Sequence, residues 1–378
     1  MKRFICFLLA VLCLSVPAFA ENDGATGVDA PSAVLMEKES GQVLYEKDSH
    51  AKMAPASVTK VMTLLLIVEA IDRGDISLDD VVCASERAAS FGGSCVFLEA
   101  GEQMSVHEML KCITVVSAND CAVAMSEFLC GSEDAFVSRM NERASELGMK
   151  DTHFTNCTGL FDDDDHYTSA YDIAVMSREL IKHELIKDYS TIWMDTIRNG
   201  EFGLSSTNKL VYYYDGCTGL KTGFTSKAGY CLSATAEREG AEYIAVIMGG
   251  ETSDKRNADA MALLNYAFAN YRLCSLRSDK VLPPVKVELG TADSVQPVYD
   301  GPESTVISKI GTQDIKYSVE LPETVPAPVS KGQQLGSLKI TAGGDLICSV
   351  PLLADCDVPR AGLWNIFTKN CKLFIGIG

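Results

Sequence analysis

The chain has 378 residues, of which 47% are hydrophobic, and it carries a formal net charge of −18. This length predicts one large or two ordinary domains, with enough apolar residues for a sizeable core. The acidic excess argues against nucleic acid as a partner, because no basic field offsets the repulsion between the protein and the phosphates.

The N-terminus has the features of an export signal. Lys2 and Arg3 precede the apolar stretch FICFLLAVLCLSV, and the small-residue triplet Ala18-Phe19-Ala20 stands before Glu21. The apolar stretch is short for a membrane span and ends in a cleavage-type sequence. We therefore predict a signal peptide over residues 1–20 and an exported mature protein, with a retained N-terminal anchor as the alternative.

The chain has 14 cysteines, and their spacing contains no C-x-x-C pair and no zinc-type array. We therefore predict no metal site. Several cysteines fall inside apolar patterns and are interpreted as free thiols that pack as small hydrophobic side chains. These are Cys112, Cys121, Cys130 and Cys231. Free thiols in an exported protein fit a compartment that is not strongly oxidising.

Residues 33–276 alternate between strand and helix patterns. A hairpin is predicted over residues 33–48, with its turn at 40–42. Helices are predicted from the capping box at Ser105, from Ser132 towards Leu147, from near Thr168, and over about 254–271. Residues 229–237 and 242–250 are predicted strands joined at Glu239-Gly240. Strands near both ends with helices between them predict an α+β fold, in which an antiparallel sheet is flanked by helices.

The region after residue 280 differs in composition. Prolines punctuate short alternating runs such as VISKIG, IKYSVEL and LGSLKIT, and helical periodicity is almost absent. This pattern predicts a small all-β C-terminal domain over residues 280–357, joined to the preceding domain by a proline-bearing linker.

The first candidate for chemistry is the stretch PASVTK at residues 55–60, directly before the apolar run VMTLLLIVEAI. A serine hydroxyl needs a base within hydrogen-bond reach to act as a nucleophile. At i and i+3 of one helix, Ser57 and Lys60 share a face, and the helix N-terminus favours negative charge on an oxygen. The same spacing at Ser49–Lys52 has no apolar run behind it. For Lys60 to be the base, burial or a second cation must lower its pKa.

Two further motifs follow in chain order. VVSAND places Ser117 and Asn119 at a break between helical patterns, as a candidate proton relay and a candidate ligand for a peptide group. Lys221-Thr222-Gly223 opens a candidate strand. The lysine would supply positive potential, the threonine hydroxyl could bind a carboxylate, and the glycine would let a substrate approach the backbone. Residues 206–208 repeat the S-x-N pattern in what is typically a turn. The order S-x-x-K, S-x-N, K-T-G supports one shared site.

With these motifs the chain resembles the low-molecular-weight penicillin-binding proteins, the serine D-alanyl-D-alanine carboxypeptidases of the bacterial cell wall. The segments SELGMKDTHFTNCTGL, HYTSAYDIAVMSREL and DGCTGLKTGFTSKAGYCLSATAEREG are also similar, and the resemblance covers about residues 30–357. It implies a β-lactamase/transpeptidase-like catalytic domain over residues 21–276 and the all-β domain after it.

The resemblance also implies the activity and its setting. The enzyme would remove the terminal D-alanine from peptidoglycan stem peptides ending in D-Ala-D-Ala, through an acyl-enzyme, without a cofactor. β-Lactam antibiotics would bind as inhibitors. The protein would act on the outer face of the cytoplasmic membrane or in the cell wall.

Site roles follow from the resemblance position by position. Ser57 becomes the acylated nucleophile, Lys60 its base and Ser117 the proton relay. The residues expected to contact substrate are Asn119, Lys221, Thr222, Gly223, Phe224, Thr225 and Arg256. The backbone N–H groups of Ser57 and Phe224 would form the oxyanion hole. The match at Arg256 requires a one-residue gap.

Three other functions fit the sequence less well. A class A β-lactamase needs an E-x-x-L-N pattern, and none occurs between Asn119 and Lys221. A histidine-based hydrolase is disfavoured because G-x-S-x-G is absent and the histidines at 50, 107, 153, 166 and 183 fall in polar or helical-surface contexts. A catalytically inactive wall-binding protein fits poorly with intact motifs. The acidic run at residues 162–165 is interpreted as a solvated turn and not a calcium loop.

Residues 359–378 form a candidate amphipathic tail. On a helical wheel one face is apolar and the opposite face polar. The apolar face holds Leu363, Ile366, Phe367, Cys371 and Phe374, and the polar face holds Asn365, Thr368, Lys369 and Lys372. The stretch is too short to span a bilayer, so an interfacial membrane anchor is predicted, with Trp364 at the headgroups. The alternative is a terminal helix docked on the protein's own β domain.

Overall fold

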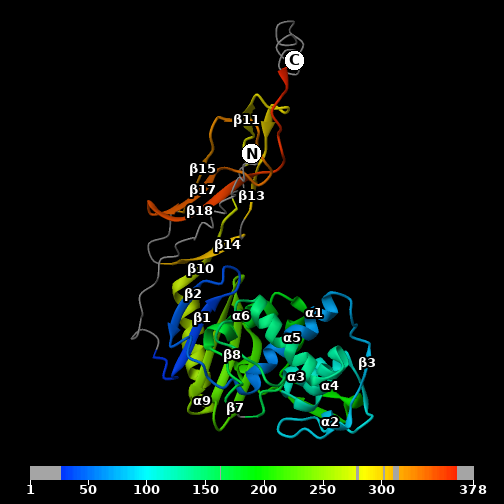
Figure 1. Ribbon diagram of the computed structural model, residues 1–378. Coiled ribbons are helices and arrows are strands. Elements are labelled where there is room, and N and C mark those ends of the chain that lie inside the picture. The colour runs from blue at the N-terminus through cyan, green and yellow to red at the C-terminus, as the bar shows by residue number, and fades with distance from the viewer. Residues whose placement is uncertain (1–26, 162, 278–280, 301–302, 310–314, 364–378) are drawn as a thin grey trace.

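The computed structural model describes residues 27–161, 163–277, 281–300, 303–309 and 315–363. The predicted signal peptide and most of the predicted tail lie outside these ranges. Figure 1 shows a larger domain of helices and strands with an all-β domain at one end. The connection between them runs through helix α9 (Ser253–Asn270) and strand β10 (Tyr271–Ser275).

The centre of the larger domain is a five-stranded antiparallel sheet in the order β2-β1-β9-β8-β7. The strands are β1 (Ser32–Glu37), β2 (Val43–Lys47), β7 (Cys217–Thr225), β8 (Gly229–Arg238) and β9 (Ala241–Gly250). The predicted hairpin at residues 40–42 and the strand pair joined at Glu239-Gly240 are confirmed. β1 pairs with β9, so the sheet is assembled from both ends of the domain, as predicted.

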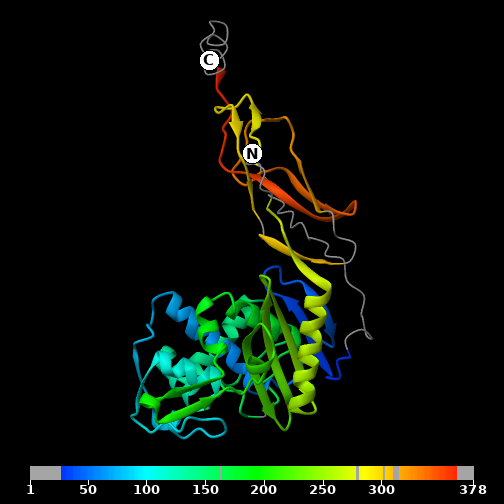
Figure 2. The ribbon, with the colours of Figure 1, turned by 180° about the vertical axis from the view of Figure 1, so that it is seen from behind.

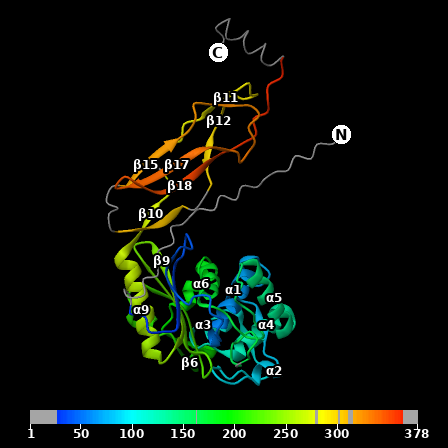
Figure 3. The same cartoon turned by 60° about the vertical axis from the view of Figure 1, so that its left-hand side comes forward.

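Both faces of this sheet are covered. In Figures 2 and 3, α9 lies on one face and the remaining long helices lie on the other. Ala33 and Leu35 of β1 belong to the core beneath α9, whereas Val34 and Met36 belong to the core shared with the other helices. Every residue of β1 is therefore buried, and the alternating exposure expected of the N-terminal hairpin is absent from this strand.

The helical layer is built around α1 (Lys60–Asp72), which is apolar on nearly all sides because other elements surround it. The predicted helices are confirmed as α3 (Val106–Val115), α5 (Glu133–Glu146), α6 (Ala170–Leu180) and α9. Each begins after a serine or threonine whose side chain accepts a backbone N–H, which satisfies an otherwise unpaired donor. α4 (Asn119–Cys130) follows α3 after a turn at residues 116–118.

Shorter elements complete the domain. They are α2 (Glu86–Ala89), α7 (Lys187–Ser190), α8 (Leu210–Tyr213), the strand pair β3 (Val81–Cys83) and β4 (Gln103–Ser105), and the strand pair β5 (Met194–Ile197) and β6 (Phe202–Ser205).

The C-terminal domain contains strands only in its described part, as predicted. One sheet has the order β13-β18-β17-β15, formed by Pro297–Tyr299, Asp345–Ala354, Gln334–Ala342 and Ile315–Glu320. A second has the order β12-β11-β16, formed by Ser294–Val295, Val285–Glu288 and Thr324–Pro326. The strand β14 (Ser304–Ser308) pairs with β10, so the two domains share a strand pair at their junction.

All cysteines in the described ranges are free. Cys112, Cys121 and Cys231 are buried, as expected, whereas the expectation was wrong for Cys130. That residue ends α4 and is exposed, because the helix terminus leaves the core there. Among the described helices, none combines the length and apolar character that crossing a membrane requires.

Candidate active site

Ser57 lies in a tight turn and not on the α-helix that was expected. Residues Ala56–Thr59 form a 3₁₀ helix, η1, which passes into α1 at Lys60. Residues i and i+3 eclipse one another in a 3₁₀ helix, so the expected proximity is preserved, with Lys60 Nζ 3.1 Å from Ser57 Oγ. Ala56, directly before the serine, has a positive φ of 49°. Such a backbone is uncommon outside glycine and persists only where neighbouring groups hold it.

The amine of Lys60 is surrounded by oxygen atoms. Its Nζ lies 2.6 Å from Asn119 Oδ1, 2.9 Å from Thr158 O and 3.1 Å from Ser57 Oγ. The amide and carbonyl oxygens can only accept hydrogen bonds. A neutral amine has two N–H donors and one lone pair, so the two obligate acceptors take both donors. The lone pair then faces Ser57 Oγ–H, which is the arrangement a general base requires.

Burial makes the neutral form of Lys60 accessible. Lys60 is fully buried, and desolvation lowers its pKa from 10.5 to about 7, against the opposing influence of Cys157, Cys95 and Asp120. Burial disfavours a charged ammonium because it removes the water that would solvate the charge. A pKa of about 7 makes the neutral amine available near neutral pH, as the hypothesis from the sequence required.

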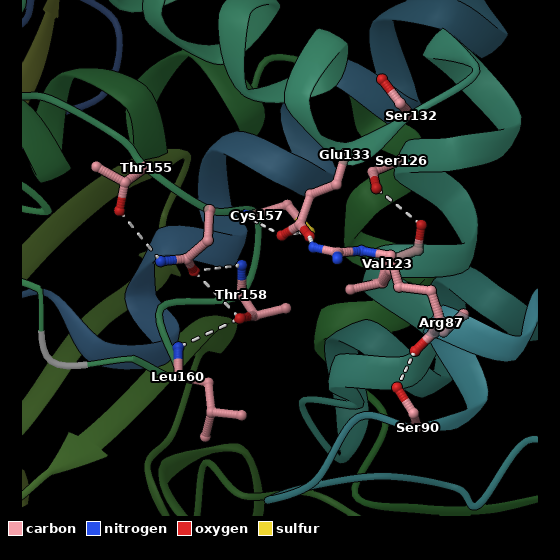
Figure 4. Close-up of polar contacts among 12 residues, drawn as sticks. Arg87, Ser90, Val123, Ser126, Ser132, Glu133, Thr155, Cys157, Thr158 and Leu160 are labelled. Carbon is pink, nitrogen blue, oxygen red and sulfur yellow. Dashed lines mark hydrogen bonds and ion pairs between the residues drawn. The ribbon is translucent and has the colours of Figure 1, made fainter.

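The segment 155–160 presents the carbonyl of Thr158 to Lys60. Asn156 Oδ1 accepts hydrogen bonds from the backbone N–H groups of Thr158 (3.1 Å) and Gly159 (2.6 Å), which shapes the turn. Figure 4 shows Thr158 bonded onward to Leu160, and Glu133 bonded to both Cys157 and Arg87.

Gly159 allows this segment to pack against the Ser57 turn. It has a φ of 70°, and a Cβ at this position would lie 1.8 Å from Ala56 O. Only glycine therefore permits the backbone of segment 155–160 to come this close to η1.

Asn119 lies at the start of α4 and bridges two parts of the site. Its Oδ1 contacts Lys60, and its Nδ2 donates to Gly92 O at 2.8 Å. The adjacent Asp120 accepts from the backbone N–H groups of Val96 and Leu98 at 3.1 Å, which holds the loop 92–98 against the helix start. The predicted substrate ligand is therefore also the group that orients the lysine.

Ser117 sits on the turn between α3 and α4, as its motif predicted. Its φ is 64°, and its buried Oγ makes no hydrogen bond within the described ranges. A buried hydroxyl without a partner is uncommon and often marks a functional group. Ser117 does not bond to Ser57 or Lys60 in this structure, so its role as a relay stays a prediction.

Strand β7 runs beside the Ser57 turn and carries the K-T-G motif. A Cβ at Gly223 would lie 3.0 Å from Ser57 N and 2.9 Å from Pro55 O, so a side chain would push the strand away from the turn. Lys221 Nζ donates to Thr222 O at 2.9 Å. Thr222 Oγ1 donates to Thr207 Oγ1 at 2.8 Å, which brings the second S-x-N segment beside β7.

The electrostatics of Lys221 differ from the expectation that it stays charged. Burial lowers its pKa well below 10.5, and the charges of Lys60 and Arg256 lower it further.

The remaining predicted residues extend from the same strand. Phe224 is exposed and its ring lies 4.3 Å from that of Tyr230, its partner on β8. Thr225 Oγ1 accepts from Ala228 N at 3.1 Å. Arg256 on α9 is buried, donates to Asn257 Oδ1 and lies 5.9 Å from the Tyr230 ring. The structure thus gathers all the predicted site residues around the edge formed by η1, α4 and β7 and the neighbouring start of α9.

The competing motif positions have structural roles. Ser49 Oγ donates to Glu46 Oε2 at 2.8 Å, and Lys52 Nζ lies 4.8 Å from the centre of the Tyr167 ring. Asn208 Oδ1 accepts from Leu210 N at the start of α8, which confirms the turn interpretation of residues 206–208. Of the acidic run, Asp162 lies outside the described residues, and Asp164 is exposed and paired with Lys227.

Sequence reasoning missed several residues that shape the site. Asn156, Thr158 and Asp120 act through hydrogen bonds that no short motif predicts. The interpretation of His166 as a polar-context residue was wrong, because it is buried against Thr59. Its neighbours in the sequence are acidic, and only the folding back of segment 155–166 removes it from water.

Fold and site together place a buried lysine beside a serine hydroxyl, an arrangement that fits serine acyl-transfer enzymes. The family profile described as D-alanyl-D-alanine carboxypeptidase matches residues 19–252, and that of the C-terminal domain of penicillin-binding protein 5 matches residues 275–360. The chain belongs to the D-alanyl-D-alanine carboxypeptidase family.

Individual relatives agree with this assignment. The D-alanyl-D-alanine carboxypeptidase DacF of Bacillus subtilis is 42% identical over 98% of each chain. Penicillin-binding protein 5 from Haemophilus influenzae superposes with a TM-score of 0.80 at 30% identity, covering 88% of this chain and 98% of that one. Penicillin-binding protein D2 from Listeria monocytogenes, solved with bound ampicillin, is 31% identical with a TM-score of 0.58, covering 63% and 97%.

Proposed function

We propose that this protein is a serine D-alanyl-D-alanine carboxypeptidase that removes the terminal D-alanine from peptidoglycan stem peptides. The observation that carries the proposal is the environment of Lys60, whose amine has two obligate acceptors and the Ser57 hydroxyl as its neighbours. Family membership supplies the substrate class.

The proposed reaction begins with neutral Lys60 accepting the proton of Ser57 Oγ. Oγ attacks the carbonyl carbon between the two D-alanines, and the resulting oxyanion accepts from the N–H groups of Ser57 and Phe224. Collapse breaks the peptide bond, and the leaving amine takes the proton held by Lys60, through Ser117. Water then attacks the ester carbonyl while neutral Lys60 accepts its proton, and Ser57 Oγ leaves with that proton, which restores the hydroxyl and releases the shortened peptide.

The terminal carboxylate of the substrate is assigned to the cationic side of the site. Arg256 supplies positive potential there, Lys221 supplies N–H donors, and the hydroxyls of Thr222 and Thr225 supply hydrogen bonds. Gly223 lets the substrate backbone lie against β7. A β-lactam takes the same route, because its strained amide occupies the position of the D-Ala-D-Ala bond.

The test is release of D-alanine from a peptide ending in D-Ala-D-Ala. We expect free D-alanine from this peptide and no free L-alanine from the matched peptide ending in L-Ala-L-Ala, with the penicillin adduct persisting for much longer than one turnover. Rapid release of hydrolysed penicillin would instead indicate a β-lactamase. Binding to cell walls without release of D-alanine would indicate an inactive wall-binding protein.

We infer that the enzyme is exported and rests on the outer face of the cytoplasmic membrane through residues 359–378. The basic, amphipathic character of this tail in an otherwise acidic chain supports the inference. The mature protein is expected to sediment with anionic lipid vesicles, whereas a version ending at Val358 stays in solution and keeps its activity on a small peptide.

A matched variant separates charge from hydrophobicity. Lys369→Gln combined with Lys372→Gln keeps the apolar face, and it is expected to weaken sedimentation most at low ionic strength. Equal sedimentation of the full-length and shortened proteins would show that the tail is docked on the β domain or has no anchoring role.

A further inference from the structure

His166 is a buried histidine for which the acyl-transfer mechanism above has no use. It follows the acidic turn at 163–165, yet only 3% of its surface is exposed, and its ring packs near that of Phe154. Burial lowers its pKa from 6.5 to about 4, with Asp163 opposing and His153 adding to the shift. At neutral pH the imidazole is therefore uncharged, with one N–H donor and one acceptor nitrogen.

The hydrogen bonds of His166 identify which nitrogen carries the proton. The backbone N–H of Thr155 donates to Nδ1 at 3.0 Å, so Nδ1 is the acceptor. Thr59 Oγ1 lies 2.8 Å from Nε2 and itself donates to Ala56 O at 2.8 Å. Because that hydroxyl proton is already used, Nε2–H must donate to Thr59 Oγ1.

This chain of hydrogen bonds ends at the residue before the nucleophile. It runs from Thr155 N–H through His166 and Thr59 to the carbonyl of Ala56, whose φ of 49° needs support from its surroundings. Ala56 O is also the atom that Gly159 packs against. Three residues from this part of the chain thus contact the Ser57 turn: Thr158 through its carbonyl at Lys60, Gly159 at Ala56 O, and His166 at Thr59.

We propose that His166 is a positioning residue that fixes the turn carrying Ser57, acting through the hydroxyl of Thr59 on the carbonyl of Ala56. The inference rests on the proposed function, since positioning is measured by the rate at which Ser57 is acylated. Its consequence is that the neutral imidazole, placed by a loop far away in the sequence, sets the angle from which Ser57 Oγ faces Lys60.

The test is the rate of acylation by penicillin in variants of the full-length protein. His166→Leu removes the hydrogen bonds of both ring nitrogens, and we expect a loss of about 10- to 100-fold in the acylation rate constant, with little change in the affinity of the first complex. His166→Gln keeps an N–H donor in the place of Nε2 and is expected to restore the rate to within about fivefold of the parent. If His166 had only a structural role, His166→Leu would lower the melting temperature of the protein. It would not then lower the acylation rate while leaving the affinity of the first complex unchanged.

Substitutions of Thr59 test the same series of hydrogen bonds at the end that contacts Ala56 O. Thr59→Val removes the hydroxyl at nearly equal volume, whereas Thr59→Ser retains it. If His166 acts through Thr59, the His166→Leu and Thr59→Val losses are less than additive when combined, and Thr59→Ser keeps most of the rate. The control is His107→Leu, which removes a histidine bonded to Tyr189 outside this network and is expected to acylate normally.

The outcomes separate the two proposals. A parent protein that penicillin does not acylate contradicts the proposed function itself. A parent that is acylated, together with a folded Thr59→Val or His166→Leu variant acylated at the parent rate, overturns the positioning role. Additive losses in the double variant would also overturn it, because they would show that His166 does not act through Thr59.

Discussion

Ser57→Ala is expected to abolish the covalent penicillin adduct and to lower the release of D-alanine on the order of 10⁴-fold or more. Without Oγ no ester can form, and the remaining groups bind the substrate but cannot form the acyl intermediate. Intact-protein mass spectrometry after incubation with penicillin measures the adduct directly, and D-alanine release measures turnover.

The matched control is Ser49→Ala. Ser49 occupies the same S-x-x-K spacing, but its hydroxyl donates to Glu46 and its lysine lies over the Tyr167 ring. This variant is expected to gain the full penicillin mass. Retained labelling of Ser57→Ala, or loss of labelling in a folded Ser49→Ala protein, would contradict the assignment of the nucleophile.

The rate of acylation is expected to rise with pH through a midpoint near 7 and to level off above it. Lys60 accepts a proton only when neutral, and burial lowers its pKa to about 7, so protonation below that pH removes the base. The measurement is the second-order rate constant for acylation by penicillin, determined from mildly acidic to mildly alkaline pH under conditions in which the chemical step limits the rate.

One substitution tests whether Lys60 is the titrating group. Asn119→Asp places a carboxylate 2.6 Å from Lys60 Nζ without changing the shape of the side chain. The opposite charge favours the ammonium form, so the midpoint should move upward by about 1–3 pH units.

The control for this shift is Asn265→Asp on α9. It adds the same charge on the opposite face of the sheet, and the introduced carboxylate can still accept the hydrogen bond that Tyr214 donates to Asn265 Oδ1. Its midpoint is expected to match that of the parent. An unmoved midpoint in Asn119→Asp would assign the titration to another group.

Local sequence determined the helices and strands and indicated the candidate catalytic motifs. Capping residues such as Ser105 and Ser132 mark helix starts because their side chains bond to backbone N–H groups three residues on, which is a local interaction. The antiparallel sheet followed from the positions of strand patterns at both ends of the domain. Ser57, Lys60 and Lys221 could be predicted as site residues because short, ordered motifs indicate their chemistry.

Tertiary structure decided how these groups work. Two S-x-x-K segments are equivalent by spacing, and only the fold buries Lys60 while leaving Lys52 at the surface. The bonds of Lys60 to Asn119 and to Thr158 O join residues 59 and 98 positions apart, beyond the range of any local pattern. Its lowered pKa is a property of that burial.

His166 is a second residue whose environment the local sequence does not predict. The four acidic residues before His166 predict an exposed, polar position. Nothing in the sequence around His166 indicates that its side chain is buried. Its burial follows from the packing of segment 155–166 against η1, which Gly159 permits and Asn156 shapes. Local composition determines which side chains are present, but long-range packing determines which of them leave water, and with that their charge and their hydrogen-bond partners.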